Sequence, residues 1–124
     1  AFGLLDRRRP KNLSGPTVSR GNGLPGVSIL SIWLSFPQSA GPFLEIMEYS
    51  EWPERPWPAV NQPGYGHIAL AVPNVRATID HVLRSGGALQ GSPTNFGSDE
   101  RPHWIVYMRD PEGKFLELEQ PALH

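Results

Sequence analysis

The chain has 124 residues, 39% hydrophobic and 19% charged, which predicts one small domain with a packed core, or one domain plus a short arm. Its net charge is −1, whereas nucleic-acid and membrane-surface modules are usually basic, so we expect neither nucleic acid nor a membrane as a partner. The absence of cysteine excludes disulfides, thiolate metal sites and thiol nucleophiles, and the lack of a long apolar run or secretory signal pattern predicts a cytoplasmic protein.

The first segment, residues 1–26, is rich in Arg, Gly, Pro, Ser and Asn. This composition is typical of a loop or arm, with one short strand expected near residues 2–7. The chain opens on Ala1 rather than Met, so we expect a processed or partial product. The arginine triplet at 7–9 is interpreted as a solvated surface, with a clamp for phosphate or carboxylate as the alternative.

Two strands and a proline-rich segment follow. Residues 27–36 are β-branched, aliphatic and aromatic, which predicts a strand, and residues 43–49 predict a second one. The turn-like sequence between them indicates a hairpin. Residues 51–64 contain four prolines and two tryptophans, which excludes a helix or a central strand. We interpret them as a surface linker with docked Trp side chains, or as a ligand lid.

The second half of the chain predicts the order β-α-β-β-β. Residues 65–72 have the composition of a strand, and Asn74 is the expected N-cap of an amphipathic helix that ends at Gly86. The sequence Asp-Pro-Glu-Gly at 110–113 is a strong turn signal. The other expected segments are a short strand at 88–90, a polar loop at 91–102, and strands at 103–109 and 114–119.

A short sequence repeat links the two halves. Phe-Leu-Glu-Ile at 43–46 recurs 72 residues later as Phe-Leu-Glu-Leu at 115–118, and the same offset places 31–36 on 103–108. A repeat of this spacing indicates two copies of one supersecondary unit. The same offset from His67 falls before the first residue. We therefore expect the first copy to lack its opening strand and most of its helix.

These segments predict an α+β fold with three regions. Residues 1–50 are expected to form an incomplete first βαβββ module, made of an arm and a hairpin. Residues 51–64 are the expected linker, and residues 65–124 the expected complete second βαβββ module. The partial first module would contribute its hairpin to the fold.

Three strands each place one ionisable residue on the face away from their aliphatic side chains. Because strand faces alternate with period two, His67, Glu45 and Glu117 converge if that face is the concave side of one sheet. One imidazole and two carboxylates suit a divalent metal ion such as Zn, Ni, Co, Mn or Fe. The alternative is that each residue faces solvent on a one-sided sheet.

Four stretches resemble the vicinal oxygen chelate superfamily, which includes glyoxalase I, methylmalonyl-CoA epimerase, extradiol dioxygenases and the fosfomycin and bleomycin resistance proteins. The resemblance extends over residues 24–120. The matching stretches are Gly-His-Ile-Ala-Leu-Ala-Val at 66–72, Arg-Ser-Gly-Gly at 84–87, Asp-Pro-Glu-Gly-Lys-Phe-Leu-Glu-Leu at 110–118, and Phe-Leu-Glu at 43–45.

The resemblance implies paired βαβββ modules that curl around a metal ion. His67 matches the first-strand ligand of the second module, Glu117 its last-strand ligand, and Glu45 the last-strand ligand of the first module. The first-strand ligand of the first module has no counterpart, so water or a partner chain would supply it. The resemblance also implies a homodimer, in which a site or a sheet is shared between chains.

The function implied is that of a metal-dependent lyase or isomerase. Such an enzyme, glyoxalase-like or epimerase-like, would act on a small chelating carbonyl substrate through an enediolate-type intermediate, with Glu45 or Glu117 as the catalytic proton shuttle. One alternative is a non-catalytic binder of a small molecule of the antibiotic type; a further alternative is an extradiol dioxygenase, whose relatives use two His and one Glu. The aromatic residues that could line a binder's cleft are Trp33, Trp52, Trp57, Trp104 and Tyr107.

Overall fold

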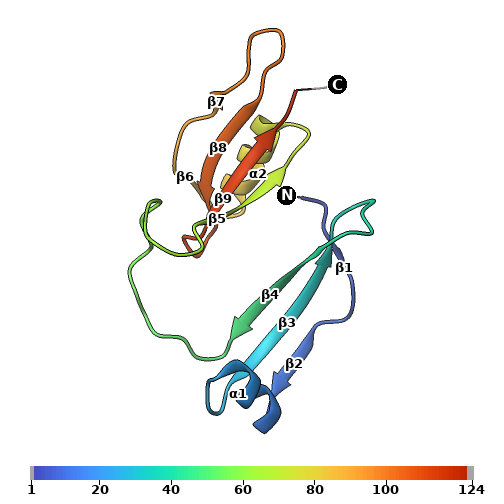
Figure 1. Cartoon of the computed structure of the whole chain (residues 1–124), viewed down its shortest axis with the longest axis vertical. Coiled ribbons are helices and arrows are strands. Elements are labelled where there is room, and N and C mark those ends of the chain that lie inside the picture. Colours follow the sequence, from blue (N-terminus) through green and yellow to red (C-terminus); the bar gives the residue numbers. More distant parts are fainter. Residues whose placement is uncertain (1, 123–124) are drawn as a thin grey trace. The chain divides into compact units, whose positions relative to one another are not determined.

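The computed structural model describes residues 2–122, which form two compact units (Figure 1). The first unit is Phe2–Arg55 and the second comprises residues 56–122, so the boundary lies inside the proline-rich segment 51–64. Each unit has one sheet and one helix, and the α+β fold class expected from the sequence is confirmed. Across the described residues, neither helix is long and apolar enough to cross a membrane.

The sheet of the first unit is built around its longest strand, β3 (Ser28–Ser35). The expected hairpin is present, because β3 pairs antiparallel with β4 (Phe43–Tyr49). On its other side β3 pairs with two short strands, β1 (Leu5–Asp6) and β2 (Lys11–Ser14). The helix α1 (Pro16–Asn22) connects β2 to β3 and begins with proline in its first turn, where the missing N–H costs nothing.

The prediction of a loop or arm over residues 1–26 is wrong in part. One short strand was expected there, and the structure has two strands and a helix. The strands have no apolar alternation of their own: Lys11–Ser14 is polar at three of four positions and largely exposed. Both strands are hydrogen-bonded to β3. Pairing with β3, rather than their own sequence, therefore determines that they are strands.

The second unit has a mixed sheet with the strand order β5-β9-β8-β6 (Figure 1). The pair β5–β9 is parallel and the other pairs are antiparallel. A short strand, β7, also pairs with β8 inside the expected polar loop 91–102, which is therefore only partly a loop. The bounds are β5 (His67–Ala71), β6 (Ala88–Leu89), β7 (Thr94–Asn95), β8 (Trp104–Arg109) and β9 (Phe115–Gln120).

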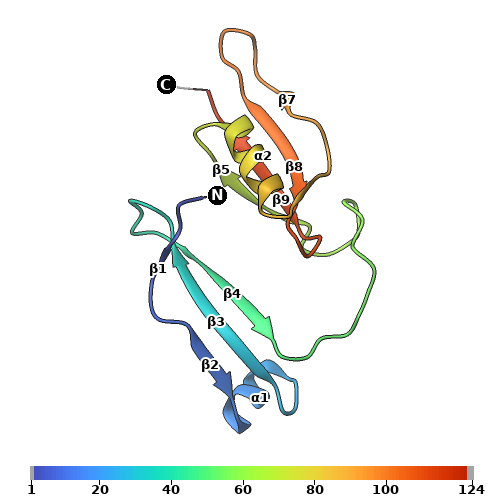
Figure 2. The same ribbon diagram turned by 180° about the vertical axis from the view of Figure 1, so that it is seen from behind.

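The helix α2 (Val75–Arg84) covers one face of this sheet, as Figure 2 shows. Asn74 is its N-cap as expected, since Asn74 Oδ1 accepts a hydrogen bond from Ala77 N at 3.0 Å. Gly86 follows the helix with φ of 90°, a left-handed conformation that glycine adopts without strain. The helix and sheet bury the side chains of Val75, Ile79, Val82, Val106, Met108 and Leu118.

The two units are copies of the same four-stranded arrangement. In the first unit β3 pairs with β4 on one side and with the short strands β1 and β2 on the other, and in the second unit β8 pairs in the same way with β9 and with β6 and β7. In the first unit Trp33 faces Glu45, and in the second Tyr107 faces Glu117. The glutamates are 72 residues apart, as the repeat predicts, but their cross-strand neighbours are 74 apart. The alignment of 31–36 on 103–108 is therefore wrong by two residues.

The physical reason for this shift is the length of the hairpin loop. The loop between β3 and β4 spans residues 36–42 and is two residues longer than the loop over 110–114 between β8 and β9. Within Phe2–Arg55, no strand or helix corresponds to β5 or α2. The helix α1 is not a counterpart of α2, since α1 lies between β2 and β3 whereas α2 lies between β5 and β6.

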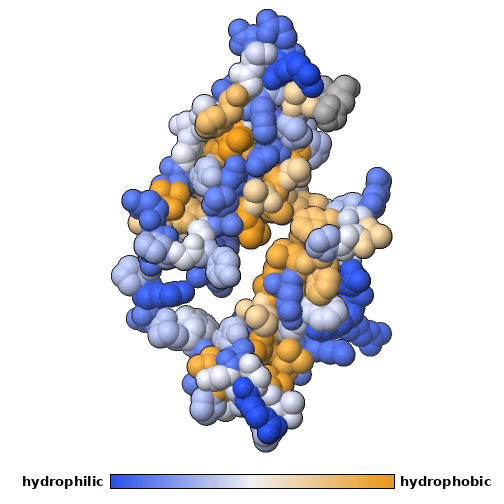
Figure 3. Space-filling model, in the orientation of Figure 1, coloured by the Kyte–Doolittle hydropathy of each residue, from blue (hydrophilic) through white to orange (hydrophobic). Residues whose placement is uncertain are grey.

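In the space-filling view, hydrophobic residues form patches bordered by hydrophilic ones (Figure 3).

Candidate metal centre

His67 and Glu117 meet on one face of the second sheet. His67 opens β5 and Glu117 lies in the middle of β9, on the face opposite the buried Leu118 that α2 covers. His67 Nε2 is 2.8 Å from Glu117 Oε2, and the side chains are 38% and 12% exposed. The parallel pairing of β5 with β9 therefore brings an imidazole and a nearly buried carboxylate into direct contact at a surface that a small molecule can reach.

Tyr107 is the third member of this cluster. It lies directly across from Glu117 on β8, and its hydroxyl donates a hydrogen bond to Glu117 Oε2 at 2.6 Å. The same hydroxyl is 3.5 Å from His67 Nε2. The hydrogen bond to Glu117, together with partial burial, raises the pKa of Tyr107 to about 12. Tyr107 therefore stays protonated near neutral pH and holds the carboxylate in one orientation.

The donor set of this cluster fits two adjacent ligands of a divalent ion. Imidazole nitrogen and carboxylate oxygen are ligands that Zn and related ions accept at about 2.1 Å, so atoms that share an ion must lie close together. His67 Nε2 and Glu117 Oε2 meet this condition. No group of three His, Asp or Glu side chains that could hold a metal ion is found among residues 2–122.

A second histidine–glutamate pair lies on the same face of the sheet. His103, just before β8, has its Nε2 atom 3.5 Å from Oε2 of Glu119. This separation is too long for a strong hydrogen bond, and the nitrogen is buried without another acceptor or donor in the described chain. The contact is an ion pair only when His103 is protonated, and the same holds for the shorter contact between His67 and Glu117.

The proline-rich segment is tied to the sheet beside the candidate centre. Arg109 lies over the ring of Phe115, 4.2 Å from its centroid, and donates to Pro58 O at 3.0 Å. The ring of Trp57 packs so closely against Gly113 that a Cβ there would approach it to 2.6 Å. Trp57 is therefore docked, which agrees with the linker interpretation for this part of the segment.

Glu45 lies in the first unit, at the position that Glu117 occupies in the second. Its Oε1 atom accepts hydrogen bonds from Ser31 Oγ at 2.6 Å and from Trp33 Nε1 at 3.0 Å. These two hydrogen bonds, followed by the nearby charge of Arg8, lower the pKa of Glu45. Arg8 also donates to Ser31 Oγ at 2.9 Å and lies over the Trp33 ring. The carboxylate is held by a small polar network of its own unit.

Of the three site residues expected from the sequence, the structure brings His67 and Glu117 together, and Glu45 stands in the other unit. Sequence reasoning missed Tyr107 as a member of the site and considered it only as a lining aromatic. Counting outward from the Asp-Pro-Glu-Gly turn pairs residue 107 with 116, within one residue of Glu117, and the observed five-residue loop 110–114 shifts the pairing to Glu117. No comparable signal was available for Arg8, whose side chain comes from a connection between strands.

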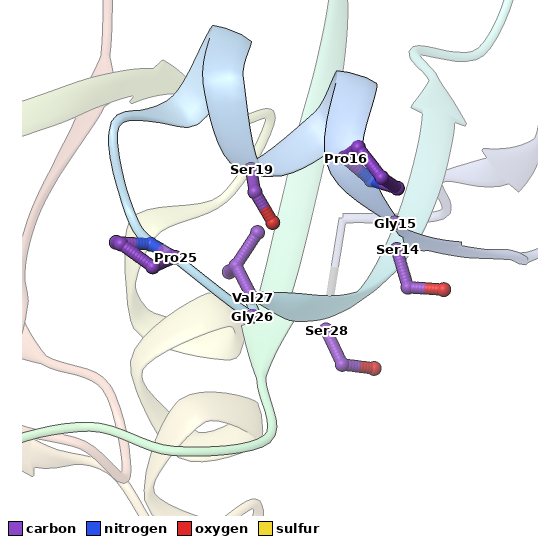
Figure 4. Close-up of a pocket in the computed structure, with 8 residues that line it drawn as sticks. All are labelled: Ser14, Gly15, Pro16, Ser19, Pro25, Gly26, Val27 and Ser28. Carbon is purple, nitrogen blue, oxygen red and sulfur yellow. The ribbon is translucent and has the colours of Figure 1, made fainter.

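A separate pocket lies in the first unit, between β2, α1 and the start of β3 (Figure 4). Serine hydroxyls and small apolar groups line it, and none of its lining residues is ionisable. It offers no general acid, base or metal ligand. The lining residues are Ser14, Gly15, Pro16, Ser19, Pro25, Gly26, Val27 and Ser28.

Comparison with known proteins finds similarity among solved structures. No protein-family model and no curated protein matches the sequence. Among solved structures, a glyoxalase family protein from Bacillus cereus superposes with a TM-score of 0.81 at 18% sequence identity, covering 98% of this chain and 80% of that one. The chain has a glyoxalase-like fold. At this identity the similarity establishes the fold alone. The activity of this chain has to be inferred from the residues of its site.

Proposed function

We propose that this chain is a divalent-metal-dependent lyase or isomerase that acts on a small carbonyl substrate able to chelate the ion. The observation that carries the proposal is the contact of 2.8 Å between His67 Nε2 and Glu117 Oε2 on an accessible sheet face. The glyoxalase-like fold supports it, because the similar solved structure is named a glyoxalase family protein. The resemblance of both residues to superfamily metal ligands supports it further.

His67 and Glu117 would hold the ion, and Tyr107 would fix the orientation of Glu117. When bound, the ion would polarise the carbonyl oxygen of the substrate. The Tyr107 hydroxyl donates a hydrogen bond to Glu117 Oε2. The other oxygen of this carboxylate, Oε1, accepts no hydrogen bond from the described side chains. A carboxylate restrained in this way loses little rotamer entropy on binding a ligand.

Glu45 is proposed as a proton shuttle, because it occupies in the first unit the position that Glu117 occupies in the second. Ser31 and Trp33 occupy Oε1, so Oε2 is left to accept a proton. The lowered pKa of Glu45 leaves the carboxylate ionised near neutral pH, so that it can accept a proton, and makes it a weaker base than an ordinary glutamate. Its fixed position on β4, rather than on a loop, favours a directed proton transfer.

Elemental analysis after reconstitution with Zn, Ni, Co, Mn or Fe tests the metal site. We expect about one ion per chain in the parent protein, and loss of the ion in His67→Ala and Glu117→Gln, because each removes one of two adjacent ligands. His81→Ala is the matched control, since His81 lies on the exposed side of α2 and has no part in the site. The loaded protein would then be assayed with 2-oxo-aldehydes, acyl thioesters and catechols.

Two outcomes would contradict this proposal. The first is a His67→Ala variant that keeps its metal content, and the second is a parent protein that takes up no ion under any loading condition. In the second case a metal-independent binder of small aromatic molecules becomes the better candidate. Its specific support is the exposure of Trp52 and Trp57, which leaves large aromatic surfaces open to a planar ligand.

A further inference from the structure

Two arginines of the first unit lie over aromatic rings on the face of the sheet that carries Glu45. The guanidinium carbon of Arg7 is 4.8 Å from the ring centroid of Phe43, and that of Arg8 is 4.1 Å from the ring of Trp33. The two rings are themselves in contact, with centroids 4.5 Å apart. Stacking on a ring restrains the arginine side chain and leaves the N–H groups at the edge of the guanidinium free to donate.

The second unit contains the same arrangement with its donors satisfied. Arg109 lies 4.2 Å from the centroid of Phe115, the residue that corresponds to Phe43 in the repeat. The guanidinium of Arg109 is surrounded by oxygen atoms of the protein. Its N–H groups donate to three oxygen acceptors, each at 3.0 Å, on Gln90, Pro58 and Gly113.

Arg7 lacks such acceptors. Within Phe2–Arg55, all of which the structure describes, its side chain makes no hydrogen bond and no ion pair. Arg8 uses one N–H group for Ser31 Oγ and one for the carbonyl oxygen of Arg9, and the rest of its donors have no acceptor in this unit. Where the second unit supplies oxygen atoms from its own chain, the first unit presents unused donors.

The charges on this face favour an anion. Lys11 lies on the same face as Arg7 and Arg8 according to the strand register, whereas Asp6 and Glu48 lie on the opposite face. The acidic group close to the arginines is the Glu45 carboxylate, and one of its oxygens already accepts from Ser31 and Trp33. The face therefore carries a net positive charge beside two stacked guanidinium groups.

We propose that Arg7 and Arg8, supported by the rings of Phe43 and Trp33, bind the oxyanion of a small molecule, either a carboxylate or a phosphate group. The guanidinium fork matches both groups through paired charged hydrogen bonds. Binding at this site requires no metal ion, so the proposal stands independently of the proposed catalytic function.

Calorimetric titration of the full chain, treated with a chelator, tests the site. Sodium phosphate and sodium acetate would be titrated separately at matched ionic strength, and we expect saturable binding of at least one. Arg7→Ala and Arg8→Ala should each weaken it about tenfold or more, as the loss of charged hydrogen bonds predicts. Arg9→Ala removes the same charge from an exposed neighbour without a ring contact, and should change affinity less than about twofold.

A second readout places the anion. The indole N–H signal of Trp33, assigned by comparison with Trp33→Phe, should shift during the NMR titration of the parent protein. Binding of phosphate alone identifies a phosphate-bearing ligand, binding of acetate alone identifies a carboxylate, and binding of both shows that the site accepts either oxyanion. The proposal is overturned if neither ion binds saturably, if Arg7→Ala and Arg8→Ala bind like the parent, or if Arg9→Ala loses as much affinity as they do.

Discussion

Each glutamate of the repeated hairpin accepts a hydrogen bond from the aromatic residue directly across on the neighbouring strand. Tyr107 donates to Glu117 through a hydroxyl, and Trp33 donates to Glu45 through an indole N–H. The charged neighbours differ, because Glu117 contacts an imidazole whereas Glu45 lies near an arginine. The same backbone position thus holds one carboxylate that contacts an imidazole and one whose pKa is lowered by its hydrogen bonds.

The hydrogen bond from Tyr107 makes the free energy of unfolding depend on pH in the alkaline range. The folded state raises the Tyr107 pKa from 10.0 to about 12, so this stabilisation is complete below pH 10 and is lost as the pH rises from 10 to about 12. We expect the free energy of unfolding of Tyr107→Phe to fall less over this range than that of the parent. Urea unfolding at several pH values between 8 and 12 measures the difference.

Tyr65→Phe is the control for this experiment, because Tyr65 is fully exposed and forms no hydrogen bond in the described chain. Its pH profile should follow the parent. Identical alkaline profiles for Tyr107→Phe and the parent would show that the hydroxyl is not held by Glu117 in solution.

The sequence predicted only those site residues whose placement follows from the alternation of strand faces. Period-two patterning placed His67 and Glu117 on faces away from the aliphatic side chains, and the structure brings these two together. Alternation says nothing about which side chain lies across a hairpin, so Tyr107 was not recognised as a site member. The arginine triplet at 7–9 was considered as an anion clamp, but the position of Arg8 beside Trp33 could not be predicted, because the side chain of a connecting segment is positioned by tertiary contacts alone.

At the level of elements, the strongest sequence signals were those that carry their own hydrogen bonds or turn chemistry. The α2 helix with its Asn74 cap and the turn at 110–113 were predicted close to their observed bounds. The short strand expected near residues 2–7 is present as β1, whereas β2 was missed, since four mostly polar residues show no periodicity. The register of β3 was misjudged because sequence does not show how many residues a loop absorbs.

Asn74 provides a direct test of how much a cap contributes to this fold. In Asn74→Ala, the backbone N–H of Ala77 loses its acceptor, and we expect the free energy of unfolding to fall by about 1 kcal/mol. Urea denaturation of both proteins measures this change. Asn61→Ala serves as the comparison, because Asn61 is exposed in a turn outside the helix and should have little effect. Equal stability of Asn74→Ala and the parent would rule out a contribution from the cap.

Across the whole molecule, the α+β class followed from sequence, and so did the β-α-β-β-β order of the second unit except for the extra short strand β7. The short strand β2 of the first unit did not follow from sequence, because it forms by pairing with β3. Within residues 2–55 the strand β4 pairs only with β3, whereas the equivalent strand β9 also pairs with β5. An open strand edge is a site for pairing with another chain. We therefore propose a homodimer in which β4 contributes its free edge.

Light scattering during size-exclusion chromatography tests the dimer. The parent should have twice the mass of one chain, and Ile46→Lys should shift it toward the monomer, because a charge on an edge strand opposes pairing. Ile46 is 45% exposed, and Leu24→Lys is the matched control at a residue that is 51% exposed outside the strands. A monomeric parent, or equal dissociation of both variants, would contradict the use of this edge. Thermal unfolding of both variants shows whether each is folded.

The parallel pairing of β5 with β9 also governs when the second sheet can form during synthesis. In the described chain β5 has no other strand partner, and β9 is the last strand to leave the ribosome. The hairpin of β3 and β4 needs only a short loop to close, whereas β5 waits for a strand that begins more than 40 residues after it ends. His67 and Glu117 therefore come together only after β9 has been synthesised, so that a growing chain without β9 does not carry this pair of residues.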